Sequence, residues 1–439
     1  MDLIEKQNNK VDKAIIPALR FPDFVNDGEW KKDTFENTFL FLPNNTLSRA
    51  ELNYENGSTK NVHYGDVLIR FGDCLDVQTN VLPFISDEAI ADRLQSSRLQ
   101  DGDVIIADTA EDETVGKCTE IFNVSGENVV SGLHTIPIRP KIQFAIPYLG
   151  FYFNSDSYRK QLLPLMQGVK VMSISKAAIG KTIVAYPSIL TEQYKIGLCL
   201  SSMDAYISAT KEKLELLKTY KKGLMQKLFP AKGKKLPELR FKEFEKDGEW
   251  EEKKLGEVTK VINRRNKSNR NLPIYSISNK DGFILQSEQF DGLDSVSRGY
   301  DISLYKIVTS HTFAYNPARI NVGSIGYSGS IKECLISSLY VCFKTTEETD
   351  DSFLMYFFDT LSFNQSVENN VEGGIRAYLF YENFSKIKIL FPSILEQKRI
   401  ASCLKAVDEE INAVSDRASE LEKQKKGLMQ KLFPITKNN

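Results

Sequence analysis

Residues that could perform catalysis are sparse in this sequence, and their spacing does not form a recognisable active site. Pro22-Asp23 followed by Glu29-Trp30-Lys31 superficially spells the motif of a metal-dependent nuclease. The three histidines lie far apart, and the six cysteines include no Cys-x-x-Cys pair, so neither residue type has the spacing of a zinc site. We therefore expect no metal site, no cofactor bound by this chain and reduced cysteines.

A second candidate is Tyr315-Asn316-Pro317-Ala318, which is comparable with the Asn-Pro-Pro-Tyr loop that adenine methyltransferases use to hold the target base. The second proline and the final aromatic residue are missing, and no glycine-rich cofactor loop precedes the segment. The glycines that follow, from Gly323 to Gly329, do not form Gly-x-Gly-x-x-Gly and lack the lysine of a phosphate-binding loop. We expect a turn in which Tyr315, Asn316, Arg319 and Asn321 face DNA. A purely structural turn is the alternative.

The elements that must position such residues appear as an internal repeat. The string Lys-Lys-Gly-Leu-Met-Gln-Lys-Leu-Phe-Pro, here called the decapeptide, occurs at 221–230 and unchanged at 425–434. A second repeat, the opening segment, runs from Leu19-Arg20-Phe21 to Asp27-Gly28-Glu29-Trp30 and returns from Leu239-Arg240-Phe241 to Asp247-Gly248-Glu249-Trp250. The nuclease-like carboxylates belong to this repeated segment, where Arg20 and Trp30 are expected to pack. The nuclease interpretation therefore fails.

The repeats divide the chain into two arms, each running from an opening segment to the decapeptide that ends it. Each arm changes character after its opening segment. Residues 34–186 and 255–391 carry short apolar runs separated by Gly-Asp and Asn-Gly, a pattern typical of strands and turns. We expect each to be a mixed α/β globule, although the two globules do not visibly match between their ends. The predicted fold class is α+β with a pseudo-two-fold internal repeat. Its globular domains are 17–186 and 231–391, and its helical regions are 187–230 and 392–434.

The helical regions have clear start and stop signals. Pro230 and Pro434 end them, because proline cannot continue a helix, and Ser393 and Glu396 have capping-box spacing at the start of the second. Apolar positions then step by alternating fours and threes, which indicates a heptad seam in the same register in both helices. The seam positions are Met203, Ile207, Thr210, Leu214, Leu217, Lys221, Leu224 and Leu228 in the first helix, and Val407, Ile411, Val414, Ala418, Leu421, Lys425, Leu428 and Leu432 in the second.

Two matching seams in one chain most simply pack against each other. The short connection from Pro230 to the second opening segment predicts an antiparallel coiled coil with one globule at each end. The alternative is that each helix packs back on its own globule.

Composition narrows the classes of function. The chain has 439 residues and a net charge of −1, which argues against a generic basic nucleic-acid binder but allows local basic faces. Such faces are expected at Arg264, Arg265 and Lys267, and at Arg376, which follows Gly373-Gly374. No apolar stretch approaches the roughly 20 residues that span a bilayer. The N-terminus has no apolar signal core, so we expect a cytoplasmic protein.

These segments together resemble the specificity subunit of type I restriction–modification enzymes over nearly the whole chain. In that family, two target recognition domains alternate with two conserved helical regions. Arm one has Ile196-Gly197 where the family pattern has Ile-Ala. The resemblance is carried by Gly28-Glu29-Trp30 and Gly248-Glu249-Trp250, Pro187 with Glu192-Gln193, Pro392 with Glu396-Gln397, Ile400-Ala401 with Leu404 and Asp408, both Lys-Leu-Phe-Pro endings, residues 313–326, and Gly102-Asp103-Val104-Ile105 with Val115-Gly116-Lys117.

The resemblance implies a chain with no catalytic centre. Each globule would read one half of a split, asymmetric site in double-stranded DNA, Lys117 and Arg376 being further candidate contacts, and the helices would fix the distance between the halves. The helices would also dock two methyltransferase subunits that use S-adenosylmethionine, and two restriction subunits driven by ATP and Mg could join them. Two other functions stay open: a coiled-coil scaffold whose globules bind proteins, which the near-neutral charge favours, and a self-sufficient methyltransferase, for which no cofactor loop is found.

Overall fold

The computed structural model describes residues 15–371 and 378–435. They form two compact units: unit 1 holds the described residues up to Lys211 and those from Asp416 onward, and unit 2 holds Glu212–Ser415. Each unit therefore contains one globule, the first part of the helix that follows it, and the last part of the helix of the other arm. Within the described ranges, no helix is both long enough and apolar enough to cross a bilayer.

The globule of unit 1 is built on a five-stranded sheet in the order β2-β11-β7-β9-β5, and a four-stranded sheet, β10-β4-β6-β3, shares a hydrophobic cluster with it. The elements are β1 (Lys31–Thr34), α1 (Phe35–Thr38), β2 (Phe39–Phe41), β3 (Leu52–Asn53), β4 (Lys60–Val62), α2 (Tyr64–Ile69), β5 (Cys74–Asp76), β6 (Phe84–Ile85), α3 (Glu88–Arg93), β7 (Val104–Ala107), β8 (Thr109–Ala110), β9 (Cys118–Phe122), β10 (Val129–Ser131), β11 (Thr135–Pro140), α4 (Leu149–Asn154), α5 (Asp156–Leu162), β12 (Met172–Ser173), α6 (Lys176–Gly180) and β13 (Ile183–Tyr186).

The globule of unit 2 is built on two four-stranded sheets, β15-β22-β19-β20 and β17-β16-β21-β18, which also share a hydrophobic cluster. The elements are β14 (Glu251–Lys254), α8 (Leu255–Val258), β15 (Thr259–Ile262), β16 (Ile274–Ser278), β17 (Gly282–Leu285), α9 (Gln286–Gln289), β18 (Lys306–Thr309), β19 (Phe313–Tyr315), the 3-10 helix η7 (Ile320–Val322), β20 (Ile325–Tyr327), β21 (Glu333–Ile336), β22 (Val341–Thr345), α10 (Asp351–Phe358), α11 (Leu361–Asn370), α12 (Tyr381–Phe384) and β23 (Lys388–Phe391).

Four strands of the first sheet have the same topology in both globules, although the sequences do not visibly match and the sheet of unit 1 has a fifth strand, β5, parallel to β9. In chain order the strands β2, β7, β9 and β11 correspond to β15, β19, β20 and β22. Both sets are ordered first-fourth-second-third in space, and every one of these pairs is antiparallel. The second sheets differ, because the parallel pair is β10 with β4 in unit 1 and β16 with β21 in unit 2. The strand order therefore diverges mainly in the second sheet.

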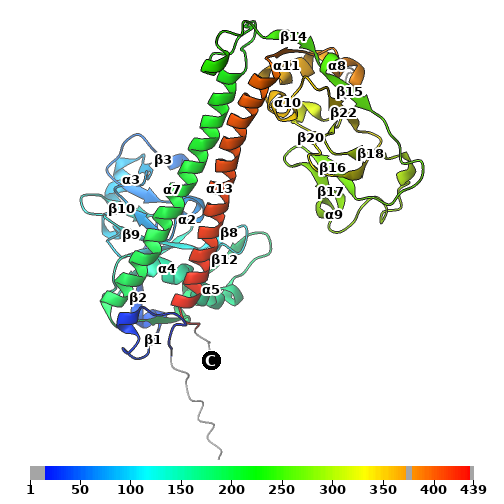
Figure 1. Ribbon diagram of the computed structural model, residues 1–439. Coiled ribbons are helices and arrows are strands. Elements are labelled where there is room, and N and C mark those ends of the chain that lie inside the picture. Colours follow the sequence, from blue (N-terminus) through cyan, green and yellow to red (C-terminus); the bar gives the residue numbers. More distant parts are fainter. Residues whose placement is uncertain (1–14, 372–377, 436–439) are drawn as a thin grey trace, which may run out of the picture. The chain divides into compact units, whose positions relative to one another are not determined.

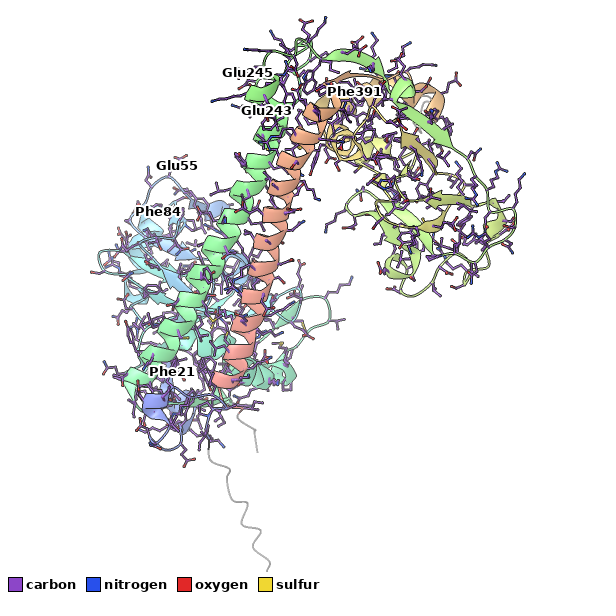
Figure 2. All side chains as sticks on the ribbon, viewed as in Figure 1. Phe21, Glu55, Phe84, Glu243, Glu245 and Phe391 are labelled. Carbon is purple, nitrogen blue, oxygen red and sulfur yellow. The ribbon has the colours of Figure 1, made fainter. Side chains whose placement is uncertain are left out.

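In each unit, the strands that enter and leave the globule are paired. Strand β1 is antiparallel to β13, with Lys31 opposite Tyr186, and β14 is antiparallel to β23, with Glu251 opposite Phe391. The helices α7 (Leu190–Leu228) and α13 (Ile394–Leu432) follow directly. Phe391 (Figure 2) contacts Phe353 of the core, with ring centroids 6.0 Å apart. Each globule is thus inserted between two paired strands. The second strand of each pair, β13 or β23, leads into the long helix.

The hydrophobic core of each globule is completed by the decapeptide of the other arm. Phe433 is buried among Trp30, Tyr148 and Tyr152 of unit 1, with ring centroids 5.8 to 6.4 Å away. Phe229 is buried in unit 2, where its ring lies 5.3 Å from that of Phe353. An arm is therefore not a self-contained module, because the decapeptide that ends it packs into the globule of the other arm.

Within each unit, α7 and α13 run antiparallel (Figure 1). In unit 1, Lys425 Nζ lies 2.6 Å from Asp204 Oδ1, and in unit 2, Lys221 Nζ lies 2.7 Å from Asp408 Oδ1. The predicted fold of two mixed α/β globules with two long antiparallel helices is confirmed. Every predicted seam position is buried or half-buried, whereas most helix residues between these positions are exposed.

The alternative packing, of each helix on its own globule, is also present. The start of each helix packs on the globule that precedes it, because Ile196 and Leu200 belong to the core of unit 1, and Ile400 and Leu404 to that of unit 2. The two packing modes predicted as alternatives therefore coexist.

Candidate nucleic-acid interface

A buried ion pair joins the opening segment to the start of the following helix in unit 1. Arg20 Nε and Nη2 donate to the two carboxylate oxygens of Glu192, each at 2.7 Å, and Trp30 Nε1 donates to Glu192 Oε1 at 3.3 Å. Hydrogen bonding to Glu192 raises the pKa of Arg20, although burial opposes it. A bidentate guanidinium–carboxylate contact fixes both distance and angle. The globule of unit 1 is therefore held rigidly on the start of α7.

Unit 2 repeats this Arg-Glu-Trp joint residue for residue. Arg240 donates to Glu396 at 2.9 and 2.8 Å, and Trp250 Nε1 donates to Glu396 Oε1 at 3.3 Å. The joint corrects the predicted capping box. Ser393 Oγ does accept from Glu396 N at 3.3 Å, but the Glu396 side chain turns to Arg240, because a buried guanidinium is a stronger partner than a backbone N–H.

The turn predicted to face DNA in globule two is only partly available. Tyr315 is fully buried against Phe343 and Phe384, so the expectation that its side chain contacts DNA is wrong. The pleat of β19 directs this side chain into the core. Asn316 is half-buried, and its Oδ1 accepts from Ala318 N at 3.0 Å, an Asx turn that holds the loop.

The residues after this turn are available for contacts. Arg319 and Asn321 are exposed, and the buried Ile320 between them anchors the loop to the core. Gly323 ends η7 at a φ of 84°, a left-handed conformation that glycine adopts without strain. Among the described residues, none forms an ion pair or hydrogen bond with the Arg319 guanidinium. The turn thus presents an amide and a guanidinium to solvent, and the guanidinium has no partner within residues 15–371 and 378–435.

A second basic loop of globule two connects β15 and β16. Arg264, Arg265 and Lys267 are exposed, and the buried Asn266 holds the loop closed, because its Oδ1 accepts from Arg270 N at 2.9 Å. Glu333 lies 3.6 Å from Arg264 and 2.5 Å from Arg270 and so neutralises part of this charge. In the part of the chain that the structure describes, Arg265 and Lys267 have no ion pair, and nothing links this loop to Arg319.

Two predicted DNA contacts, Lys117 and Arg376, lie outside these two loops. In globule one, Lys117 Nζ donates to Leu68 O at 2.7 Å, and burial lowers the pKa of this lysine. Lys117 lines a groove of about 610 Å³ that also contains Asp73, Asp112 and Glu113. These carboxylates disfavour a phosphate there, so contact of Lys117 with DNA stays a prediction without structural support. Arg376 lies outside the described residues.

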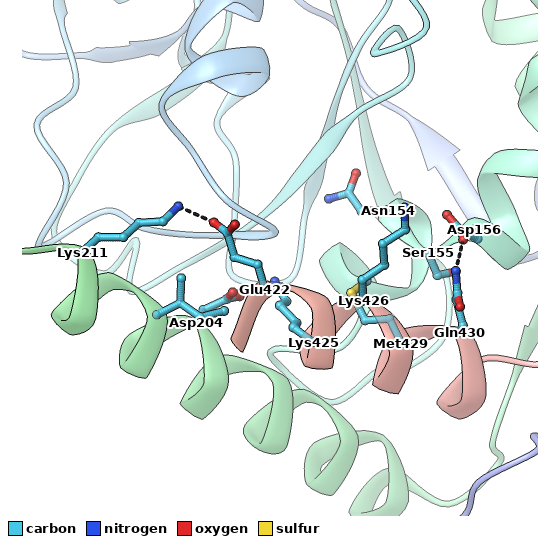
Figure 3. A pocket seen from close by; sticks show the side chains of 11 residues that line it. Asn154, Ser155, Asp156, Asp204, Lys211, Glu422, Lys425, Lys426, Met429 and Gln430 are labelled. Atoms are coloured by element: carbon cyan, nitrogen blue, oxygen red, sulfur yellow. Dashed lines mark hydrogen bonds and ion pairs between the residues drawn. The ribbon is translucent and has the colours of Figure 1, made fainter. Parts of the chain in front are cut away.

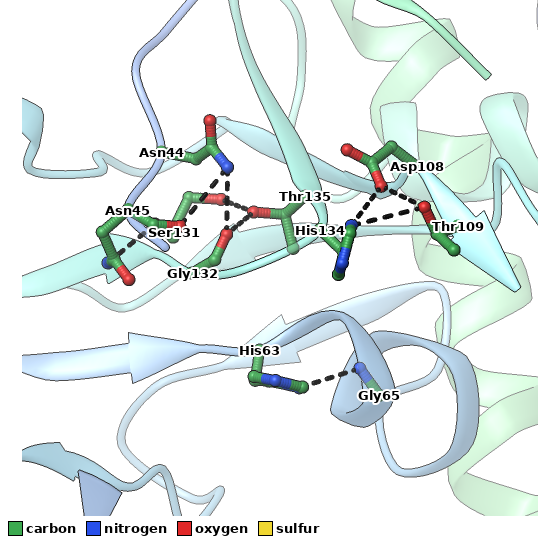
Figure 4. Close-up of polar contacts among 10 residues, drawn as sticks. All are labelled: Asn44, Asn45, His63, Gly65, Asp108, Thr109, Ser131, Gly132, His134 and Thr135. Atoms are coloured by element: carbon green, nitrogen blue, oxygen red, sulfur yellow. Dashed lines mark hydrogen bonds and ion pairs between the residues drawn. The ribbon is translucent and has the colours of Figure 1, made fainter. Parts of the chain in front are cut away.

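Globule one carries a polar cluster that the sequence did not reveal (Figure 4). His134 is exposed at a φ of 53°, and its Nδ1 lies 3.3 Å from Asp108 Oδ1 and 3.4 Å from Thr109 Oγ1. Behind it, Ser131 Oγ and Thr135 Oγ1 are hydrogen-bonded at 2.7 Å. Ser131 and Thr135 are buried, so only the exposed His134 and the half-buried Asp108 and Thr109 present fixed donors and acceptors that suit the base edges of a DNA groove. The sequence signal for this cluster is that Asp108 and Thr109 follow β7 and His134 precedes β11, the strand that pairs with β7.

Two substitutions separate the core residue from the exposed one in the loop after β19. Tyr315→Phe should change the free energy of unfolding by less than about 1 kcal/mol, because the buried hydroxyl has no partner among the described residues. Arg319→Ala should weaken DNA binding by about 1–3 kcal/mol if the side chain contacts a base or phosphate. Thermal unfolding and a DNA-binding titration check the pair. Weaker binding by Tyr315→Phe at unchanged stability would contradict the assignment.

Comparisons with known proteins agree with this architecture. Residues 247–423 match the family model described as the type I restriction modification DNA specificity domain. A protein of Methanocaldococcus jannaschii, provisionally named as the specificity subunit of the type I restriction enzyme MjaX, is 26% identical over 348 residues, which cover 76% of this chain and 78% of the relative. The crystal structure of a type I restriction–modification S subunit from M. genitalium superposes with a TM-score of 0.56 at 13% identity, covering 96% of this chain and 100% of the other.

The similarities to known proteins agree on one class of protein. The M. genitalium structure confirms the fold, and residues 247–423, which lie in unit 2 and the following turns of α13, match the family model. The resemblance to the specificity subunits of type I restriction–modification enzymes is confirmed.

Proposed function

We propose that this chain is the DNA-recognition subunit of a type I restriction–modification complex and reads a bipartite, asymmetric site. The observation that carries the proposal is a repeated frame that holds two different second sheets. The Arg-Glu-Trp joint and the decapeptide recur without change, so both globules are mounted in the same way. Two globules that are attached to the helices in the same way but carry different loops would read different bases, one half-site each.

The chain itself is proposed to be non-catalytic. Among the described residues, no group of three His, Cys, Asp or Glu side chains could hold a metal ion, and the Asn316 turn is held by its own backbone contacts. In this proposal two methyltransferase subunits bind the chain and supply S-adenosylmethionine, and two restriction subunits that use ATP and Mg can join. Because the joint and the decapeptide occur twice in the chain, they would offer two equivalent binding places for two copies of the same partner.

The experiment is co-expression with the type I methyltransferase subunit of the same organism, followed by sequencing of N6-methyladenine in the host DNA. We expect a split motif with two short, different halves and a fixed gap. A stable complex without methylation and without retardation of DNA at moderate salt would overturn the proposal in favour of a scaffold whose globules bind proteins. Binding of S-adenosylmethionine by the chain alone, measured by isothermal titration, would contradict the non-catalytic role.

A helix insertion tests whether α7 and α13 set the gap. One heptad inserted after Lys211 and another after Ser415 lengthens both helices by about 10 Å, since each residue rises about 1.5 Å. Seven residues are close to two full turns, so the rotation is small. The methylated motif should keep both half-sites and gain a gap longer by about two to three base pairs, since B-DNA rises about 3.4 Å per pair. Altered half-sites with an unchanged gap would refute the hypothesis that α7 and α13 set the gap.

A further inference from the structure

In globule two, both candidate DNA-binding loops leave the same end of the first sheet. Strands β15 and β19 are both antiparallel to β22 and so run in one direction, and the loops that carry Arg265 and Arg319 follow their last residues. In globule one, β2 and β7 are likewise both antiparallel to β11. The residues that follow β2 and β7 therefore occupy the end of the sheet that corresponds to the basic loops of globule two.

Three polar residues occupy this end of the sheet in globule one (Figure 4). Asp108 and Thr109 follow β7, and His134 precedes β11; we call these three residues the acceptor group. Thr109 Oγ1 donates to Asp108 Oδ1 at 2.7 Å, and His134 Nδ1 lies 3.3 Å from the same oxygen. In the described part of the chain, no hydrogen bond or ion pair reaches the other carboxylate oxygen, Asp108 Oδ2. The acceptor group is therefore fixed by internal contacts and can still bind a donor.

The acceptor group presents lone pairs to solvent. The hydroxyl hydrogen of Thr109 is used in the bond to Asp108, and an ionised carboxylate has only acceptors. The carboxylate beside Nδ1 favours the proton of the neutral His134 ring on that nitrogen, which leaves Nε2 as an acceptor. In the DNA major groove, the amino groups of cytosine and adenine donate to such acceptors, whereas guanine and thymine present oxygen atoms that repel them.

The ring of Tyr64 restricts the position of His134. It meets the His134 ring edge-on, with centroids 5.2 Å apart, and its centroid lies 4.6 Å from that of the buried His63 ring. Tyr64 N donates to Leu133 O at 3.3 Å, which ties the start of α2 to the residue before His134. A side chain that is positioned before DNA binds loses less conformational entropy on binding. These contacts therefore preorganise the acceptor group.

A pair of exposed arginines borders α2, the helix that Tyr64 begins. Arg49 Nη2 and Arg70 Nη1 lie 2.8 and 3.3 Å from Oδ1 of the buried Asp66. Tyr54 Oη accepts from both guanidinium groups, at 3.3 and 3.1 Å. The two arginine side chains stay 45% and 41% exposed, so further N–H groups face solvent. Two cations against one buried carboxylate leave a net positive charge, which suits the phosphates that flank a base-reading group.

The two grooves of unit 1 suit DNA less well than this end of the sheet. The groove beside the end of α13 has a volume of about 420 Å³ and is lined by as many carboxylates as lysines (Figure 3). They are Asp156, Asp204 and Glu422, and Lys211, Lys425 and Lys426. The groove at Lys117 holds three carboxylates against two basic residues. Neither groove has the excess of positive charge that DNA phosphates favour.

We propose that the acceptor group reads the amino group of a cytosine or an adenine in the half-site of globule one, and that Arg49 and Arg70 hold the neighbouring phosphates. The two globules then read DNA by different chemistry, since the corresponding loops of globule two present cations and an amide. Phosphate contacts position a protein and base contacts give specificity, so Asp108 determines base choice and the arginines contribute affinity. The proposal rests on the proposed function, which makes globule one a reader of DNA.

The test uses the full-length chain co-expressed with the type I methyltransferase subunit of the same organism. Sequencing of N6-methyladenine should show that Asp108→Asn relaxes or changes one position of one half-site, where wild type requires cytosine or adenine, because the amide adds a donor. The gap and the half-site that responds to Arg319→Ala should stay the same. The matched control Asp112→Asn changes an exposed carboxylate between β8 and β9 and should keep the whole motif.

A binding titration with the purified complex removes the amino group from the DNA instead. The base at the altered position is replaced by its analogue without the amino group, 2-pyrimidinone for cytosine or purine for adenine. Wild type should bind this DNA about 10- to 100-fold more weakly, the range for one base-specific contact, whereas Asp108→Ala should bind both DNAs with nearly equal affinity. Arg49→Gln should weaken binding to both DNAs alike and reduce the dependence on salt.

His134→Asn separates base reading from folding, because asparagine tolerates the left-handed backbone of His134, at a φ of 53°. Its thermal midpoint should equal that of wild type, while its discrimination between the two DNAs falls. A bipartite motif that Asp108→Asn and His134→Asn both leave unchanged would overturn the assignment and leave the proposed function standing. A motif altered by Arg49→Gln would overturn the division between base choice and affinity. Absence of any motif in wild type would overturn the proposed function and the assignment together.

Discussion

Phe433→Ala should destabilise unit 1 by about 3–5 kcal/mol, the range for truncating a buried aromatic side chain, and leave unit 2 unchanged. Phe433 belongs by sequence to the second arm, but it is 1% exposed and packs edge-on against Trp30, Tyr148 and Tyr152. Its removal leaves a cavity among rings that cannot collapse. Hydrogen–deuterium exchange resolved by peptide should show lost protection in residues 30–186.

The matched variant Phe229→Ala makes the reciprocal test. Phe229 is 7% exposed and stacks on Phe353, so its truncation should expose residues 250–391 and spare the first globule. If each variant instead loosened the globule of its own arm, the exchange of decapeptides between the two arms would be wrong. The control variant Ile435→Ala changes an exposed residue just after the second decapeptide and should alter stability by less than about 0.5 kcal/mol.

Glu192→Ala should cost about 3–5 kcal/mol of stability in unit 1, because it leaves the Arg20 guanidinium buried without its partner. The side chains of Arg20 and Glu192 are 7% and 1% exposed, and Trp30 Nε1 loses its acceptor at the same time. Glu396→Ala should have the same effect in unit 2, where Arg240 and Glu396 are 10% and 1% exposed. Urea unfolding followed by tryptophan fluorescence reports both joints, since Trp30 and Trp250 lie inside them.

Two comparisons make this prediction sharper. Glu249→Ala breaks the exposed Lys235–Glu249 pair, whose side chains are 63% and 61% exposed, and should cost no more than about 1 kcal/mol. Arg20→Met combined with Glu192→Leu removes both charges and should recover much of the loss, since uncharged packing replaces an ion pair without leaving a buried charge. A double variant as unstable as Glu192→Ala would show that the hydrogen bonds to Trp30 and Gly28 dominate the joint.

The frame of the molecule could be predicted from the sequence because its signals are local. Proline ends, heptad spacing and exact repetition predicted helices at 187–230 and 392–434, close to the observed Leu190–Leu228 and Ile394–Leu432. The partners of Glu192 and Glu396 could not be predicted, since each lies more than 140 residues from its arginine. A buried bidentate pair has no periodic signature.

The candidate site was harder to predict than the frame. The charged members of the loops, Arg319, Arg265 and Lys267, are exposed as their residue types suggest. Tyr315 was misplaced because an aromatic residue beside Asn-Pro fits a binding turn and a strand end equally well, and only the pleat of β19 decides between them. The topology that four strands of the first sheets share could not be predicted from the sequence, because apolar side chains replace one another in a core without changing strand order.

The exchange of decapeptides also determines when each globule can be finished during synthesis. The first globule leaves the ribosome first, yet Leu432 and Phe433 of its core are made roughly 250 residues after its last strand, a delay of about 10–50 s at usual rates of translation. The second globule needs nothing beyond the first turns of α13 and the already completed α7. The order of completion is therefore the reverse of the order of translation, and the nascent first globule keeps an open apolar face until the chain is almost complete.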